Sequence, residues 1–506
     1  EAFEDSWHWG DAAAAAYEDV ITQGVYTDAS VLLRGIVSAL GKNDMTAYLA
    51  MMAVRLIELH RVLKPTGSLY LHCDPTASHY LKIVLDGVFG AENFRNEIIW
   101  KRTGSHGGAK RWGPIHDVIL FYSKSDQFVW NRTYEEYNQG YLDKFYRFSD
   151  ERGRYRLVTL TGAGTRTGDS GTAWRGVDPT KSGRHWALPA GALAKTYPEL
   201  SMRGLNTQEK LELLDKAGLI YWPTRGSVPQ QKRYADEAPG VPVQDLITDI
   251  RPLGTADAER LGYPTQKPVT LLERIINASS NPGDVVLDPF CGCGTAVHAA
   301  EKLGRRWVGI DVTHLAISLV ERRLKDAFPN IAFEVLGTPR DLSAARDLAA
   351  RDKHQFQWWA VSLLDAVPQG GKKKGADRGI DGIRWVRTGP RDGNLDRVII
   401  SVKGGENVSV RDVRDLAGTV QREGALGGVL ITLADPTRDM LREAASHGYA
   451  STGLGQFRKI MVKTIAELMA GVHDDAERLP PLGRGEGFRR APREQAARPP
   501  QAGLFE

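Results

Sequence analysis

Two acidic residues near the middle of the chain flank a loop that contains two glycines. Asp288 and Asp311 each follow an apolar run and lie 23 residues apart. That distance is near the spacing of about 20 residues at which an acid on a second strand meets a ribose hydroxyl. Gly292 and Gly294 lie just after the first acid, and glycine lets a backbone approach a ligand because it has no Cβ. These residue types at this spacing predict a nucleoside site.

The ligand that best matches this loop is a cationic nucleoside. A dinucleotide loop needs a third glycine three residues after the second, where the helix packs on the strand, and this sequence has Val297 there. An acid at the start of the loop would also repel a pyrophosphate, whereas it suits the amino group of S-adenosylmethionine. The residues therefore disfavour a nucleotide-dependent oxidoreductase. A strand–helix–strand unit without any ligand is the other alternative.

The elements around the loop are predicted from the apolar runs. Val285 to Leu287 indicates a strand buried on both faces, because no polar residue interrupts the run. Residues 295–303 indicate a helix, Trp307 to Ile310 a second strand, and residues 313–326 a further helix. If the two strands are parallel, their carboxyl ends and the acids that follow them lie at one edge of the sheet.

The loop sequence resembles the cofactor motif of the amino-methylating DNA methyltransferases, as Asp288-Pro289-Phe290-x-Gly292-x-Gly294-Thr295. It is most similar to the β-order branch, in which the catalytic motif precedes the cofactor motif. The resemblance covers roughly residues 1–326 and implies a Rossmann-like α/β sheet with helices on both faces. It implies S-adenosylmethionine as cofactor, with residues 266–268 at its methionine end. The cofactor contacts that it implies are Asp288, Pro289, Phe290, Gly292, Gly294, Thr295, Asp311, Gln266, Lys267 and Pro268.

The catalytic motif of that family does not occur in the sequence. Its members flip the target base out of the duplex and bind the amine with an Asp-Pro-Pro-aromatic loop, because the nitrogen lone pair is delocalised into the ring. Asp288-Pro289-Phe290 belongs to the cofactor loop, and Asp74-Pro75 lacks the second proline and the aromatic residue. In β order the catalytic loop is expected upstream of Glu1. No catalytic residue for methyl transfer is therefore assigned, and this chain alone is expected to bind the cofactor weakly or not at all and not to methylate.

A DNA-recognition region is expected between the two halves of the methyltransferase domain. Residues 131–250 are aromatic, basic and rich in turns, and in the resembled family the segment at this place reads double-stranded DNA. The resemblance implies an adenine-specific DNA methyltransferase of the restriction-modification type, with cytosine N4 as the alternative target. Arginine suits bidentate contacts to guanine, and arginine and lysine both suit phosphates. Predicted DNA contacts are Lys101, Arg102, Arg111, Arg166, Arg175, Arg184, Lys232 and Arg233.

The sequence after residue 355 predicts a second α/β domain. The run Gly379-Ile380-Asp381-Gly382 and the run Val398 to Lys403 place an acid and a lysine on adjacent strands. In nucleases such an acid binds Mg²⁺, and the lysine polarises water or phosphate. The pattern resembles the Mrr-like branch of the restriction-endonuclease fold, but Ser401 stands where Glu or Gln is expected. Nuclease activity is therefore left open. The alternative function is a DNA-binding protein that uses its methyltransferase-like part for recognition only.

The length of 506 residues suggests about three domains of ~100–200 residues. Lys and Arg number 66 against 62 Asp and Glu, so any basic surface is local. Three cysteines make no disulfide framework, which is typical of a reducing cytoplasm, and no long uncharged apolar run predicts a membrane span.

The predicted parts are the target-base half (1–130), the recognition insertion (131–250), the cofactor half (251–335), a linker (336–355), the Mrr-type domain (356–470) and a disordered tail (471–506). The last six residues of the tail, 501–506, resemble a sliding-clamp docking motif.

Overall fold

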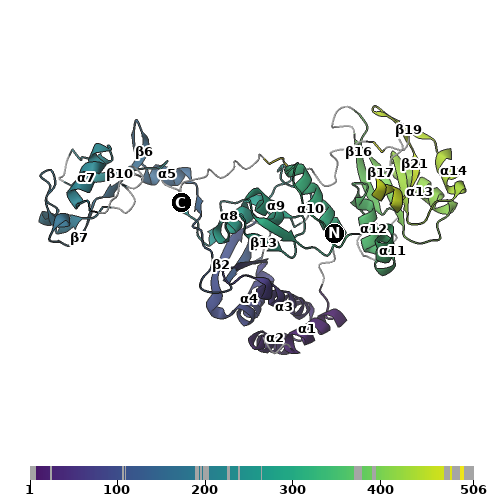
Figure 1. Cartoon of the computed structure of the whole chain (residues 1–506), viewed down its shortest axis with the longest axis horizontal. Helices are drawn as coiled ribbons and strands as arrows, with labels where there is room; N and C mark the ends of the chain where they lie inside the picture. The colour runs from purple at the N-terminus through teal and green to yellow at the C-terminus, as the bar shows by residue number, and fades with distance from the viewer. Residues whose placement is uncertain are drawn as a thin grey trace. The chain divides into compact units, whose positions relative to one another are not determined.

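The structure of the chain is a computed structural model (Figure 1). It divides into two compact units, Arg132–Gln244 and the combination of Glu1–Asn131 with Asp245–Glu506. Among the residues described, no helix has both the length and the apolar character that a membrane span requires. The structure describes residues 7–22, 26–104, 108, 110–188, 193, 197, 204–224, 228–237, 240–263, 265–369, 379–389, 395–471, 479–480 and 491–494.

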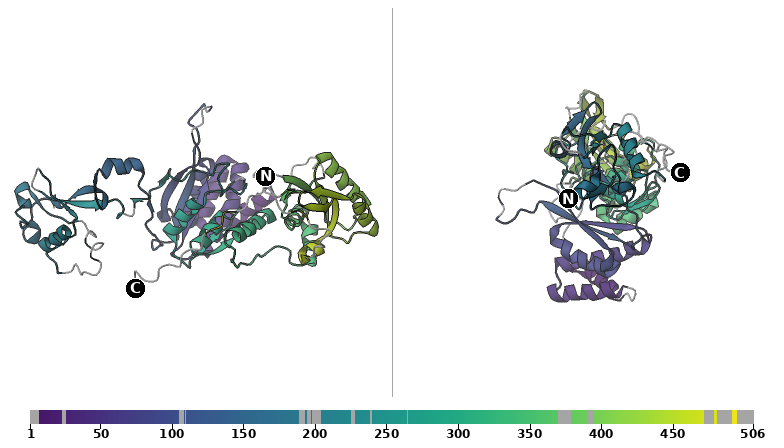
Figure 2. Two further views of the ribbon diagram at one scale, coloured as in Figure 1. Left: turned by 90° about the horizontal axis from the view of Figure 1, so that it is seen from above. Right: turned by 90° about the vertical axis from the view of Figure 1, so that its left-hand side faces the viewer.

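A four-stranded sheet forms the first part of the larger unit. Its order is β1-β3-β2-β12, with β3 antiparallel to both neighbours and β12 parallel to β2. Alternate residues of a strand face opposite sides. Leu120 and Tyr122 therefore join the apolar cluster of helices α1 to α4, which are purple in Figure 2, while Ile119 packs with Leu271. The elements are α1 (Asp11–Thr22), α2 (Thr27–Leu40), α3 (Asp44–Val62), β1 (Ser68–Cys73), α4 (Pro75–Phe89), η1 (Ala91–Asn93), β2 (Phe94–Lys101), β3 (His116–Ser123) and β12 (Leu246–Ile247).

Helix α8 joins this sheet to the part that carries the glycine loop. Leu271 of α8 packs with Ile119 and Trp100 of the sheet, and Ile276, on the next turn, packs with Ala299 of α9. Strands β13 and β14 pair in parallel, and α9 connects them. The strand–helix–strand unit predicted around the loop is therefore confirmed. Its elements are α8 (Val269–Ser279), β13 (Val285–Asp288), α9 (Thr295–Lys302), β14 (Arg306–Gly309) and α10 (His314–Ala327).

The strand pair at the loop is less covered than the sequence predicts. In the described part of the chain, β13 and β14 pair only with each other and do not join the four-stranded sheet. Val286 and Trp307 face the helices, but Val285, Leu287 and Val308 are 44%, 37% and 47% exposed. The predicted burial of the run Val285 to Leu287 on both faces is wrong, because, within the described residues, helices cover only one face of this strand pair.

The smaller unit, Arg132–Gln244, lies inside the predicted recognition insertion. Its largest sheet has the order β5-β6-β10-β9. Tyr155, Trp174 and Trp186 form a buried aromatic core with Leu211 and Leu214 of α7. The elements are β4 (Tyr134–Glu135), α5 (Gln139–Phe145), β5 (Phe148–Asp150), β6 (Gly153–Thr159), β7 (Thr161–Ala163), η2 (Asp169–Gly171), η3 (Pro179–Ser182), β8 (Arg184–Trp186), α7 (Thr207–Lys216), β9 (Ile220–Tyr221), β10 (Gln230–Tyr234) and β11 (Val241–Pro242).

The second domain contains a five-stranded sheet that is buried on both faces. Its order is β15-β16-β17-β18-β21, and β17, β18 and β21 run parallel. Ile400 packs with Phe356 of α12 on one face, and Ile399 packs with Leu416 of α13 on the other, as expected for an α/β domain. The elements are α11 (Leu342–Arg351), α12 (Lys353–Ser362), β15 (Val367–Pro368), β16 (Gly382–Arg387), β17 (Leu395–Lys403), α13 (Val410–Glu423), β18 (Gly427–Thr432), α14 (Arg438–Ser446), β19 (Tyr449–Thr452), β20 (Gly455–Arg458), β21 (Ile460–Thr464) and α15 (Ile465–Ala470).

Part of the predicted disordered tail is packed. Ala491 is 8% exposed, and the N–H of Glu494 donates a hydrogen bond to the carbonyl of Ala327. The prediction of disorder over residues 471–506 is therefore wrong for residues 491–494, because an apolar contact and a hydrogen bond hold them on α10. The segment that resembles a sliding-clamp motif, residues 501–506, lies outside the described residues.

Candidate functional site

The loop between β13 and α9 is shaped by two glycines with left-handed backbone conformations. Gly292 has a φ of +49° and Gly294 a φ of +71°, values that residues with a Cβ rarely adopt. Space is also short, because a Cβ on Gly294 would lie 2.8 Å from Cγ2 of Val320 and one on Gly292 would lie 3.2 Å from Cε1 of Tyr263. The loop therefore requires glycine at both positions.

Asp311 connects this loop to the turn that follows β14. Its Oδ2 accepts a hydrogen bond from the backbone N–H of Gly292 (3.0 Å). Its Oδ1 accepts hydrogen bonds from the backbone N–H and the hydroxyl of Thr313 (both 2.9 Å). A carboxylate has about four acceptor sites, so Asp311 keeps acceptor capacity for a ligand while it fixes the loop.

Asp288 ends β13 at the same edge of the strand pair as Asp311. The parallel register places Asp288 opposite Gly309, two residues before Asp311. Burial raises the pKa of Asp288, the charge of Asp311 raises it further, and the charge of Lys267 lowers it. The edge is therefore an acidic site with one lysine beside it, and a cationic group of a ligand would stabilise the charged form of Asp288.

The side chains of the run at residues 266–268 have different surroundings. Gln266 accepts a hydrogen bond from the N–H of Leu261 (2.8 Å) and donates one to the carbonyl of Glu259 (2.7 Å), so it braces its own turn. Lys267 donates to the carbonyl of Thr265 (3.0 Å). Burial lowers the pKa of Lys267, and the charge of Asp117 opposes this. Cofactor contacts from Gln266 and Lys267 both stay predictions.

The remaining predicted cofactor residues lie around the loop with different exposures. Phe290 is 50% exposed, and Pro289 beside it is half-buried. Pro268 is the N-cap residue of α8. Thr295 is buried, and its hydroxyl accepts a hydrogen bond from Nη1 of Arg323 (3.1 Å). Thr295 therefore binds the protein behind the loop, and cofactor contacts from these residues stay predictions.

An ionic cluster beside this site escapes the sequence analysis. Nε2 of His72 donates to Oδ2 of the buried Asp117 (2.9 Å), and Nε of Arg102 lies 3.2 Å from Oδ1 of Asp117. Burial alone would raise the pKa of Asp117, but the hydrogen bond from His72 and the charges of Arg102 and Lys267 lower it below its usual range. His72 and Asp117 lie diagonally on antiparallel strands. In the sequence, the features that could have indicated this pair are the runs LHCD (residues 71–74) and HD (residues 116–117), which lie at the same end of the two strands.

Replacing Asp117 with alanine is expected to lower the free energy of unfolding by about 2 kcal/mol, because His72 and Arg102 lose the buried carboxylate that binds both. Urea unfolding followed by circular dichroism measures the change. The matched control is Asp126→Ala, since the side chain of Asp126 is 88% exposed and pairs with Arg95. The control is expected to change the same free energy by less than about 0.5 kcal/mol. Equal losses in the two variants would contradict a structural role for the cluster.

The eight predicted DNA-contact residues fall into two groups. Those of the first group have partners inside the protein: Arg102 with Asp117, Arg175 with Glu212, Arg184 with Thr161 and Lys232 with Asp150. Those of the second group are the exposed Lys101, Arg111 and Arg166 and the half-buried Arg233. DNA contact stays a prediction for all eight, and residues of the first group would have to share their present partners with a phosphate or a base.

The predicted nuclease residues are close together, but their polar atoms are engaged. Oδ2 of Asp381 accepts a hydrogen bond from the N–H of Val402 (2.6 Å), and Oδ1 accepts one from Nε2 of Gln357 (3.2 Å). Nζ of Lys403 lies 3.6 Å from Oδ1 of Asp412. Within the described ranges, no three His, Cys, Asp or Glu side chains are grouped as a metal would need. Mg²⁺ binding by Asp381 therefore stays a prediction.

Two family models match separate parts of the chain. The model described as DNA methylase matches residues 37–322, which is more than half of the 506 residues. The model described as NACHT-associated inactive restriction endonuclease 1 matches residues 366–462. The second match includes Asp381 and Lys403. The predicted methyltransferase part and the predicted second domain therefore match two different family models.

Relatives of known type match the first of these parts. The type II methyltransferase M.EcaI of Enterobacter cloacae is 34% identical over 278 residues, which are 55% of this chain and 57% of the relative. The Mod subunit of the type III restriction-modification enzyme StyLTI of Salmonella typhimurium is 28% identical over 302 residues, 57% of this chain and 43% of the relative. The chain thus spans about half the length of each of these two relatives.

A solved structure is also similar over this part. The crystal structure of a DNA modification methylase from Thermus thermophilus, complexed with S-adenosyl-L-methionine, has a TM-score of 0.29 and 18% sequence identity. The match covers 58% of this chain and 83% of that chain. The family assignment depends on the match of the DNA methylase model to more than half of the residues. By that match, the chain belongs to the DNA methylase family.

Proposed function

We propose that this chain is the cofactor-binding and DNA-recognising part of a site-specific DNA methyltransferase that uses S-adenosylmethionine and acts on an exocyclic amino group. Membership of the DNA methylase family supports the reaction class. The observation that carries the choice of cofactor is the loop, where Asp288 and Asp311 flank a bend that has no room for a Cβ. Adenine N6 is the first candidate acceptor, and cytosine N4 is the second.

The residues at this edge fit S-adenosylmethionine group by group. When bound, the cofactor supplies the methyl group on its sulfonium sulfur. Asp311 would accept hydrogen bonds from the ribose hydroxyls, because its oxygens retain free acceptor sites. Asp288 would pair with the methionine ammonium group, and Lys267 with the methionine carboxylate. Gly292 and Gly294 would let the backbone lie against the nucleoside.

The second candidate function is supported by the match of the second domain to a model of inactive restriction endonucleases. In this alternative the protein binds DNA, and the methyltransferase-like part contributes recognition only. The second domain is proposed to be an Mrr-type restriction-endonuclease-like domain that contacts DNA without cutting it, because Ser401, whose hydroxyl lies 3.4 Å from Oδ2 of Asp381, supplies no second carboxylate for a metal ion.

Calorimetric titration of the full chain with S-adenosylmethionine is expected to show binding at one site, with at least about tenfold preference over NAD, or about 1.4 kcal/mol. Preference for NAD would contradict the cofactor assignment. A radiolabelled-methyl assay on duplex DNA, performed with a chain extended upstream of Glu1 to include the expected catalytic loop, then separates the two functions, since label on adenine or cytosine supports methyl transfer. Cofactor binding without any label on DNA supports the recognition function instead.

A further inference from the structure

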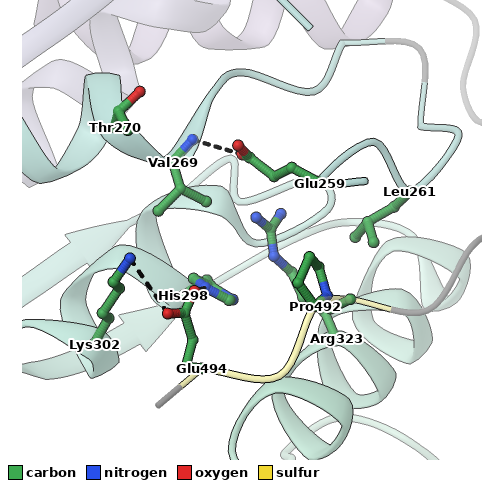
Figure 3. A pocket seen from close by; sticks show the side chains of 10 residues that line it. Glu259, Leu261, Val269, Thr270, His298, Lys302, Arg323, Pro492 and Glu494 are labelled. Carbon is green, nitrogen blue, oxygen red and sulfur yellow. Dashed lines mark hydrogen bonds and ion pairs between the residues drawn. The ribbon is translucent and has the colours of Figure 1, made fainter. Parts of the chain in front are cut away.

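Residues 491–494 are docked on the helices behind the glycine loop, although they follow the second domain in sequence. Ala491 packs in one apolar cluster with Cys293 and Leu319. The N–H of Glu494 donates to the carbonyl of Ala327 at the end of α10 (3.0 Å). Figure 3 shows this segment in yellow, with Glu494 turned toward the side chains of α9. The segment therefore contacts both helices that hold the loop.

Glu494 supplies a carboxylate to a buried polar group. One carboxylate oxygen of Glu494 accepts a hydrogen bond from Nε2 of His298 (2.9 Å), and the other lies 3.3 Å from Nζ of Lys302. His298 is 2% exposed. Burial, together with the charge of Arg323 and to a lesser degree that of Lys302, lowers the pKa of His298 to about 4 against the opposing effect of Glu494, so the imidazole is neutral near pH 7. Loss of Glu494 would leave this buried N–H without its acceptor.

Arg323 links the same region to the loop. It is 2% exposed, and its Nη1 donates to the carbonyl of Cys293 and to the hydroxyl of Thr295 (both 3.1 Å). Within the described residues, its Nε has no hydrogen-bond partner. The guanidinium faces a cavity of about 160 Å³ that Pro492 and Glu494 help to line. The docked segment therefore forms one wall of the cavity that contains the side chain bound to the loop.

Tyr263 provides a second link between the segment and the loop. It belongs to the same buried cluster as Ala491 and Cys293. Its ring also flanks the loop, since Cε1 lies 3.2 Å from the place that a Cβ on Gly292 would take. Tyr263 thus belongs to one buried cluster with Ala491 and also lies beside the loop.

We propose that the face of α9 and α10 behind the loop is a docking site for a short acidic segment, that residues 491–494 of the same chain occupy it, and that docking stiffens the loop and strengthens cofactor binding. The complementarity of Glu494 to Lys302 and His298 argues for this occupant. The effect on the cofactor rests on the proposed function, whereas docking itself does not. Docking would connect the end of the second domain to the cofactor site.

The test uses the full chain with Glu494→Ala. Hydrogen exchange measured by mass spectrometry is expected to become faster in the peptide that contains residues 491–494 and in the peptide that contains residues 292–297, because both lose contacts of the docked state. The dissociation constant for S-adenosylmethionine, measured by calorimetry, is expected to rise about tenfold. Glu494→Gln is expected to give a smaller change of the same sign, since its amide oxygen can still accept from His298.

The matched control is Arg493→Gln, because Arg493 lies in the same segment with an exposed side chain. It is expected to leave exchange and affinity unchanged. Unchanged exchange at residues 292–297 in Glu494→Ala would overturn the docking proposal even if the wild-type chain binds the cofactor. A wild-type chain that binds no S-adenosylmethionine would overturn the proposed function instead, and the exchange data would still decide whether the segment is docked.

Discussion

Replacing Asp311 with alanine is expected to weaken the binding of S-adenosylmethionine by about 100-fold. The variant loses the acceptor for the ribose hydroxyls and also releases the N–H of Gly292 and the hydroxyl of Thr313, which the carboxylate holds at 3.0 Å and 2.9 Å. A hydrogen bond to a charged group contributes about 1.5–3 kcal/mol, and each 1.4 kcal/mol is about tenfold in affinity. Isothermal titration calorimetry measures the dissociation constant.

Two further variants separate the role of this charge from general loss of structure. Asp311→Asn keeps an oxygen that can accept from Gly292 and is expected to lose about tenfold in affinity. Asp284→Ala is the control, because Asp284 lies before β13, at the opposite end of the strand, where it accepts a hydrogen bond from the N–H of Asn281. It is expected to bind like the wild type. Wild-type affinity in Asp311→Ala, with the same thermal midpoint, would refute the assignment of the cofactor site.

The elements at the site are predictable because their signals are local. The sequence predicts a helix over residues 295–303, and the structure has α9 at Thr295–Lys302. The glycines of the loop are equally local, since left-handed backbone and a missing Cβ concern one residue each. The exposure of Val285 and Leu287 could not be predicted locally. An apolar run indicates that a strand can be buried, but whether each face is covered depends on segments distant in the sequence.

Contacts between distant residues could not be predicted in the same way. His298 and Glu494 are 196 residues apart, and no pattern in either neighbourhood points to the other. A tail rich in Pro, Gly and Arg is typical of disorder, and four docked residues do not change that composition. The pair of His72 and Asp117 needs the register of two antiparallel strands, which a sequence without a defined turn leaves open. Composition and periodicity therefore predict elements better than they predict ionic partners.

Replacing Ser401 with glutamate is expected to create a Mg²⁺ site in the second domain. Ser401 is 7% exposed, and its hydroxyl lies 3.4 Å from Oδ2 of Asp381. Lys403, two residues further along β17, projects from the same face of the strand. A glutamate at position 401 would add a second carboxylate beside Asp381, and Mg²⁺ binds through one or two carboxylates. In the wild type, Ser401 supplies no carboxylate, and no three possible metal ligands are grouped within the described residues, so little response to Mg²⁺ is expected.

Thermal unfolding of Ser401→Glu in MgCl₂, compared with NaCl at equal ionic strength, measures this gain. With a dissociation constant of about 1 mM, binding at about 10 mM Mg²⁺ would stabilise the folded domain by about 1.4 kcal/mol. Ser401→Gln has a side chain of the same size without charge and should show no such stabilisation, and Asp381→Asn added to Ser401→Glu should remove it. If the Ser401→Glu variant folds but MgCl₂ does not stabilise it, the predicted Mg²⁺ site between positions 381 and 401 would be contradicted. Stabilisation of the wild type by Mg²⁺ that Asp381→Asn abolishes would instead make Asp381 a metal ligand without any help from position 401, and the domain would then be a candidate nuclease.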